Sequence, residues 1–108
     1  MTNSLEQLLN LCLRARGLVS GDVAVRKAIQ SKKAYLILVA KDASPRTVEQ
    51  FIKIAQPYLI PLAICGSKND FGRILKKPPR SVVAITDQHF TQGVLRVLER
   101  GEGQIMIV

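Results

Sequence analysis

The chain has 108 residues, an apolar fraction of 47% and a formal net charge of +8. This length and apolar content predict one domain, residues 1–108, with a real hydrophobic core, and they exclude a disordered basic tail. No apolar run reaches the ~18 residues of a membrane span, and the N-terminus lacks a signal-peptide pattern, so we expect a cytoplasmic protein.

The N-terminal segment predicts a helix and a short strand. Ser4 and Gln7 resemble a capping box at the start of the helix, and Gly17 ends it. Residues 18–19 allow a short strand before the next helix begins. The helical stripe consists of apolar residues at i, i+3, i+4 and i+7, namely Leu5, Leu8, Leu9 and Cys12.

The next segment predicts helix, strand and helix in close succession. Gly21 introduces a second helix that runs to about Ser31. Residues 35–40 form a continuous apolar run, which is typical of a strand covered on both faces. Ser44 is the predicted N-cap of a third helix, with Pro45 in its first turn, and Pro57 ends it.

The C-terminal half continues the alternation. We expect a strand over residues 59–65, a short helix over about 69–76 and another strand over 81–86. Asp87 caps a final helix closed by Gly101, and the apolar residues 105–108 are able to form an edge strand. Alternating helices and strands predict an α/β fold, a three-layer α/β/α sandwich around a small, mostly buried mixed sheet.

Chemistry-bearing constellations are scarce. The lone His89 fits a surface or packing role, and Cys12 and Cys65 fit small buried apolar residues, although the sequence leaves their pairing open. Asp42 and Thr86 follow two strands and would share one sheet edge, as in a phospho-acceptor receiver domain. However, the acidic pair that holds magnesium in a receiver is absent. We therefore expect Asp42 to cap a turn into the third helix, and we expect no enzyme, metal or cofactor.

The basic residues are segregated along the chain. Seven lie between Arg14 and Lys41 with one acid, Asp22, and five lie between Lys68 and Arg80 with one acid, Asp70. Charge clustered in this way on a compact domain favours a polyanion partner, and nucleic acid in particular.

Three segments, at residues 20–29, 36–45 and 67–75, together resemble small bacterial members of the kink-turn-binding ribosomal proteins of the L7Ae and L30e type. The first has a glycine before a helix and a lysine six residues later, Gly21 and Lys27. The second is an apolar strand ending in Ala-x-Asp-x-x-Pro, and the third has the pattern Ser-Lys-x-x-hydrophobic-Gly. The resemblance covers about residues 4–100 and implies an α/β/α sandwich that binds structured RNA.

The resemblance also implies which surface binds. In the family, the start of the second helix enters the widened groove at a sharp RNA bend, and the loop before the last central strand packs against a flipped-out base. Unpaired N–H groups at a helix N-terminus favour phosphate. The implied RNA-binding residues are Gly21, Asp22, Val23, Ala24, Lys27, Lys41, Arg73, Lys76, Lys77, Pro78, Pro79 and Arg80.

Two features depart from strong kink-turn binders. Val23 and Ala24 stand where those proteins carry Asn-Glu, which bonds to sheared G·A pairs, and the final loop is basic rather than apolar. The sequence therefore keeps the cations that bind phosphate but lacks the side chains that read bases. The alternatives are a backbone-reading RNA binder without motif preference and a ribosome-associated protein-interaction module using residues 104–108. In each case we expect a monomer.

Overall fold

The structure is a computed structural model that describes residues 1–106, apart from the side chain at position 102. Ten main elements alternate along the chain, with a 3-10 turn, Gln56–Tyr58, after the third helix and a π-helical turn, Leu98–Glu102, after the fifth. In order they are α1 (Asn3–Arg14), β1 (Leu18–Ser20), α2 (Asp22–Gln30), β2 (Leu36–Val39), α3 (Pro45–Ala55), β3 (Leu62–Cys65), α4 (Lys68–Leu75), β4 (Val82–Ile85), α5 (Gln88–Val97) and β5 (Gly103–Met106).

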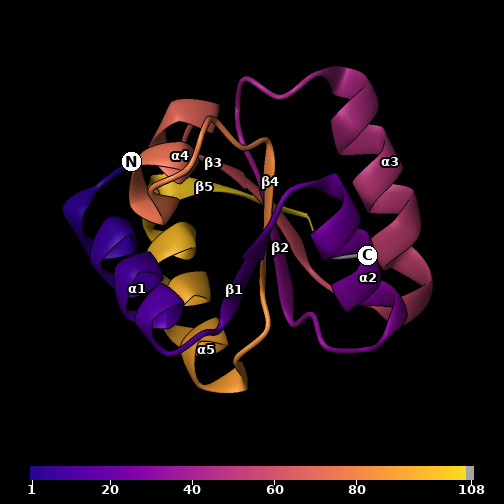
Figure 1. Cartoon of the computed structure of the whole chain (residues 1–108), viewed down its shortest axis with the longest axis horizontal. Coiled ribbons are helices and arrows are strands. Elements are labelled where there is room, and N and C mark those ends of the chain that lie inside the picture. The colour runs from indigo at the N-terminus through magenta and orange to yellow at the C-terminus, as the bar shows by residue number, and fades with distance from the viewer. Residues whose placement is uncertain (107–108) are drawn as a thin grey trace.

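The strands form one mixed sheet in the order β1-β4-β2-β3-β5. The β2–β3 pair is parallel, and the other three pairs are antiparallel. Helices α1, α4 and α5 cover one face of the sheet, and α2 and α3 cover the other (Figure 1). The predicted α/β/α sandwich is therefore confirmed.

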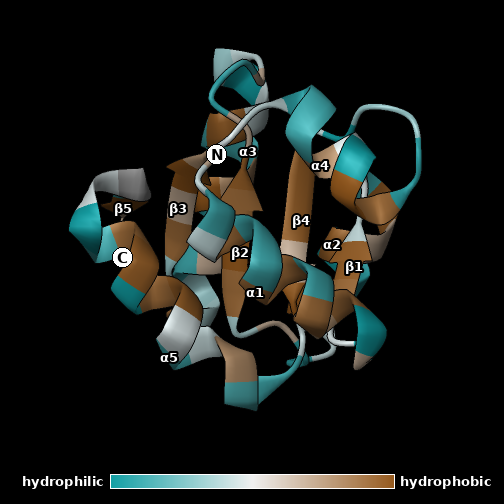
Figure 2. Cartoon of the chain, turned by 90° about the vertical axis from the view of Figure 1, so that its left-hand side faces the viewer, coloured by the Kyte–Doolittle hydropathy of each residue, from teal (hydrophilic) through white to brown (hydrophobic). Residues whose placement is uncertain are grey.

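Strand alternation divides the core between the two faces. Leu36 and Leu38 pack with the α1 side, whereas Ile37 and Val39 pack with the α2 side, and all four are fully buried. Because both faces need apolar side chains, the central strands read as continuous apolar runs. Figure 2 shows the brown strands behind the amphipathic α1.

Several predicted boundaries were wrong by a few residues. Helix α1 has Thr2 at its N-cap, so Ser4 lies within the helix and forms no capping box. The third helix ends at Ala55, shortly before Pro57 as predicted, and the chain then continues as a 3-10 turn. The C-terminal edge strand begins at Gly103 and pairs with β3. The predicted strand residues 107–108 lie outside the described part.

The idea that Asp42 and Thr86 share a sheet edge was also wrong. Strand β4 runs antiparallel to β2, with Leu36 opposite Ile85 and Val39 opposite Val82. Thr86 therefore lies beside the start of β2, while Asp42 lies beyond its end. No alternation pattern reports strand direction, so only the pairing separates these two residues.

The two cysteines are buried, and the histidine is exposed. Cys12 and Cys65 are buried and not joined in a disulfide. Burial, and secondarily the Asp87 carboxylate, raises the pKa of the Cys12 thiol from 9.0 to about 11. His89 is exposed, and its backbone N–H donates to its N-cap Asp87. Within the described part of the chain, no helix is long and apolar enough to cross a membrane.

Candidate nucleic-acid interface

The turn into α2 is fixed by a glycine. Gly21 is the N-cap residue, with φ 89° and ψ 160°, a conformation open essentially only to glycine. Its N–H donates to the Val82 carbonyl (3.0 Å), which holds the start of α2 against the start of β4. Within residues 1–106, no side chain caps this helix, so its first N–H groups stay available to an outside acceptor.

We expect Gly21→Ala to destabilise the fold by about 1–3 kcal/mol, because alanine must adopt a strained backbone there. An added Cβ would meet no atom within 4 Å, so the effect comes from φ and ψ and not from crowding. Urea unfolding measures it. A loss within error of zero would mean that the turn relaxes freely.

The loop from Lys76 to Arg80 is held on top of α4. Lys76 ends the helix in the left-handed conformation, and the Lys77 N–H donates to the Gly72 carbonyl (2.9 Å). The Arg80 N–H donates to the Lys68 carbonyl (3.1 Å). Because both ends of the loop are bonded to α4, Lys76, Lys77 and the two prolines remain exposed in a defined arrangement.

A hollow of about 260 Å³ joins the α2 turn to this loop, and α3 forms its third wall. Arg80 lines this hollow, and its Nε–H is buried and has no hydrogen-bond partner among the described residues. A buried unpaired donor is costly unless a ligand or water satisfies it. The lining residues come from three elements and the loop: Gly21, Asp22, Thr47, Phe51, Pro79, Arg80, Ser81 and Val82.

The acid beside the hollow is already paired. Both Asp22 carboxylate oxygens accept hydrogen bonds from Arg26, one turn along α2. Arg26 also donates to Gln50 (3.2 Å) and lies 5.2 Å from the centre of the Phe51 ring. The pair thus leaves this helix start close to neutral, which reduces the repulsion of phosphate that Asp22 alone would cause.

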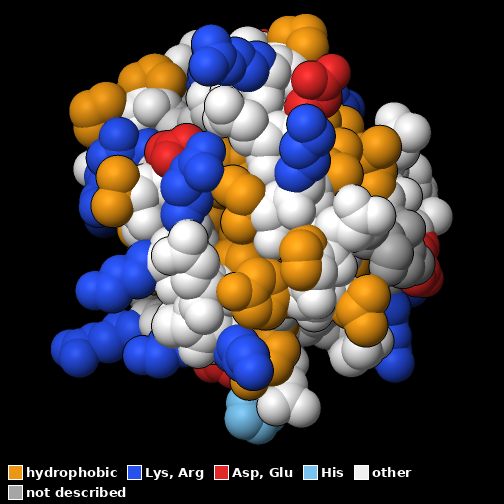
Figure 3. All heavy atoms as spheres, turned by 90° about the vertical axis from the view of Figure 1, so that its right-hand side faces the viewer, with side chains coloured by type: hydrophobic (Ala, Val, Ile, Leu, Met, Phe, Trp, Pro, Cys, Tyr) orange, Lys and Arg blue, Asp and Glu red, His pale blue; other side chains and the backbone are white. Residues whose placement is uncertain are grey.

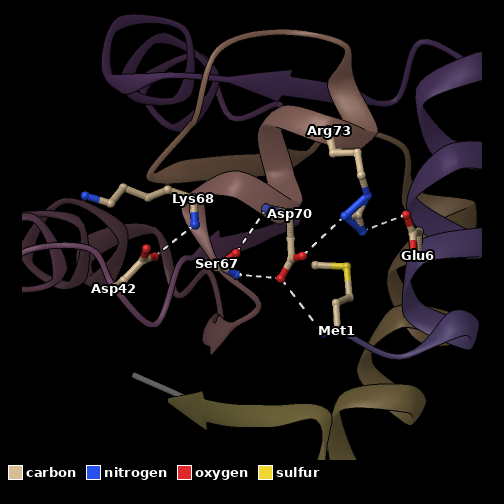
Figure 4. Close-up of polar contacts among 7 residues, drawn as sticks. All are labelled: Met1, Glu6, Asp42, Ser67, Lys68, Asp70 and Arg73. Atoms are coloured by element: carbon tan, nitrogen blue, oxygen red, sulfur yellow. Dashed lines mark hydrogen bonds and ion pairs between the residues drawn. The ribbon is translucent and has the colours of Figure 1, made fainter.

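Two further lysines lie at this end of the sheet. The Lys41 N–H donates to the Gly66 carbonyl (2.9 Å), directly before the N-cap of α4. The Lys68 N–H donates to the Asp42 carboxylate (2.9 Å), so Asp42 binds the first N–H group of α4, whose N-cap is Ser67, and does not cap the third helix as expected (Figure 4). Lys68 was missed as a site residue, although the Ser-Lys-x-x-hydrophobic-Gly pattern contains it.

Arg73 lies apart from this arrangement. It pairs with Glu6 of α1 (2.9 Å) and with Asp70 of α4 (3.4 Å) and is directed away from Lys68 (Figure 4). These contacts join α1 to α4 behind the loop. The structure therefore gives Arg73 a scaffold contact and does not bring it to the hollow.

The other predicted residues lie on α2. Val23 projects into solvent with 81% of its surface exposed, and Ala24 is half-buried beside it. Lys27 lies further along the helix and lines a separate hollow with Ala24. The predicted residues thus divide between the Gly21–Arg80 hollow and the flank of α2.

The fold and this end of the sheet define a class of protein. It is a small α/β/α sandwich in which an uncapped helix start and a cationic loop meet above a mixed sheet. Across residues 3–95 the sequence matches the model of the ribosomal protein L7Ae/L30e/S12e/Gadd45 family. The chain belongs to that family.

Individual relatives agree with this assignment. The chain is 37% identical over 92 residues to the RNA-binding protein YlxQ of Bacillus subtilis, covering 85% of this chain and 92% of YlxQ. It is 28% identical to YlxQ of Enterococcus faecium, covering 85% and 88%. A protein of unknown function from Bacillus halodurans has a similar structure, with a TM-score of 0.84, 28% identity and coverage of 92% and 99%.

A more distant structure shares the fold. The 15.5kD RNA binding protein of Giardia lamblia superposes with a TM-score of 0.74 at 23% identity, covering 90% of this chain and 83% of that one. At this identity the likeness shows the fold alone.

Proposed function

We propose that this chain is a non-catalytic RNA-binding protein that holds a bent, structured RNA at the Gly21–Arg80 hollow. The observation that carries the proposal is the hydrogen bond from the Gly21 N–H to the Val82 carbonyl (3.0 Å). It joins the helix start to the start of β4, two residues after the cationic loop ends at Arg80. Membership of the family and the relatives named for RNA binding support the same reading.

The hollow offers contacts for both backbone and base. The free N–H groups of α2 and the cations Lys76, Lys77 and Arg80 would bind phosphates. Pro79 supplies exposed apolar surface against which a flipped-out base would pack, beside the guanidinium group of Arg80. Among the described residues, the only acid that lines the hollow is Asp22, and it is already bonded to Arg26, so these residues offer no pair for proton transfer.

Recognition would rest on shape more than on base edges. Val23 is exposed where strong kink-turn binders carry a polar reader, and its side chain neither donates nor accepts. We expect a kink-turn RNA to bind more tightly than the same RNA with its G·A pairs replaced by Watson–Crick pairs, because only the former is bent to fit. Equal affinities in a gel-shift titration would favour the backbone reader without motif preference.

Binding should also depend on salt. With three to five phosphate contacts, the logarithm of the association constant should fall against log salt with a slope of about −3 to −5, since each contact releases condensed counterions. Fluorescence anisotropy with a kink-turn RNA at several potassium concentrations measures the slope. A flat response together with no detectable complex would falsify the proposed function.

A further inference from the structure

A second basic surface runs along the outer side of α2, away from the Gly21–Arg80 hollow. A shallow hollow of about 270 Å³ lies between α2 and the edge strand β1, with Lys27 and Lys33 on its rim. Both lysines are exposed, and among the described residues neither takes part in an ion pair. The remaining lining residues are small or apolar and none is acidic: Val19, Ala24, Ala28, Ser31 and Thr86.

Arg16 extends this surface at the far end of β1. It precedes Gly17, whose carbonyl accepts a hydrogen bond from the Thr86 N–H (2.8 Å), and Thr86 lines the hollow. Arg16 is also exposed and has no ion pair within the described residues. We call Arg16, Lys27 and Lys33 the basic flank. In the face drawn in Figure 3, Lys and Arg side chains likewise project into solvent along the lower left edge.

Arg16 has a left-handed backbone conformation, which glycine adopts more readily than any other residue. It has φ 60° and follows the end of α1, where Gly17 donates back to the Cys12 carbonyl (2.8 Å). Helices α2 and α4 end in the same way, with Lys32 and Lys76 at the left-handed position. A cation near a helix C-terminus is stabilised by the helix dipole. At this position, however, it must adopt a left-handed backbone that costs glycine nothing. At each of these three α-helix ends the left-handed residue is a cation, whose charge interacts favourably with the helix dipole.

We propose that one double-helical arm of the bound RNA lies along the basic flank, with Arg16 and Lys33 contacting its phosphates beside Lys27. The inference rests on the proposed function. The nine residues of α2 span about 14 Å, so a duplex that follows the whole helix would run beside it for roughly 4 nucleotide steps of ~3.4 Å each. The flank presents cations and small apolar side chains without an acid. Such a surface can bind a uniform phosphate backbone, but it has no groups that would read base edges.

The test uses Arg16→Gly combined with Lys33→Ala in the full chain. Glycine suits the backbone at position 16, and the capping bond of Lys33 uses its backbone N–H, so the fold should remain intact. The matched control is Lys32→Gly with Lys53→Ala, which removes the same charge. Lys32 lines a different hollow, with Pro57 and Tyr58, beyond the other side of α2.

The probes are kink-turn RNAs with arms of about 10 base pairs, and versions in which one arm is cut to about 3, which is shorter than α2. With the long arms, we expect the Arg16/Lys33 variant to bind at least about tenfold more weakly at low salt and to lose about 2 from the salt slope. When the shortened arm is the one that lies on the basic flank, the Arg16/Lys33 variant should bind this RNA like the wild type. The control variant should bind every RNA like the wild type.

Two results would overturn the proposal. If wild type and variant bind the long-armed RNA equally, no duplex lies on the flank, even though the proposed function stands. If the variant and the control lose the same affinity, the loss reflects net charge and not a located contact. Failure of the proposed function has a different signature, since the wild type would then bind neither RNA.

Discussion

Replacing Lys76 and Lys77 together by alanine is expected to weaken kink-turn RNA binding by about 50- to 100-fold near 0.1 M salt and to lower the salt slope by about 2. Both side chains are exposed, and the loop is already fixed by the bonds of Lys77 to Gly72 and of Arg80 to Lys68. The alanines remove charge and leave these backbone bonds in place. Fluorescence anisotropy across a salt series gives both quantities.

The opposite end of the molecule supplies the control for this prediction. Lys32 also has a left-handed backbone, and Lys53 is exposed on α3, so replacing both by alanine matches the charge and the backbone context. That variant should bind like the wild type. If it loses as much affinity as the loop variant, the Lys76–Arg80 loop is no specific contact. The single change Lys76→Gly removes the charge without straining the left-handed backbone, so it separates the effect of charge from the effect of backbone strain.

Gly72→Ala is expected to displace the same loop from beneath. An added Cβ would lie 2.8 Å from the Lys77 carbonyl oxygen and 2.9 Å from that of Pro78, and both are backbone atoms. The better helix propensity of alanine, about 1 kcal/mol, is outweighed by overpacking of about 1–3 kcal/mol. We expect lower stability in urea and at least about tenfold weaker RNA binding, as the cations leave their positions.

Gly93→Ala is the matched control for that variant. Gly93 is also inside a helix, but its added Cβ would meet the Leu8 side chain at 3.7 Å, an ordinary contact. This substitution should stabilise the protein by about 0.5–1 kcal/mol and leave RNA binding unchanged. If Gly72→Ala behaves in the same way, the close packing of the loop on α4 does not position the cations.

The structure brings only some of the predicted site residues together, for a physical reason. Gly21 and the loop ending at Arg80 do lie together, yet the walls formed by Thr47 and Phe51 went unnoticed. In the sequence these two residues look like ordinary residues of α3, because helical periodicity predicts which side chains are buried but not which other segments they contact. Arg73 stands in the same basic run as the loop, but helix geometry turns it towards Glu6.

The sequence by itself determined the order of elements, the two-sided core and the glycine at position 21, because these follow from local periodicity and backbone preference. It also placed the cations along the chain. Only the tertiary structure decided which cations share a surface, since the antiparallel β4 brings the loop ending at Arg80 to Gly21 and leaves Thr86 at the other end. Strand direction and neighbour order depend on long-range pairing, and no local pattern encodes them.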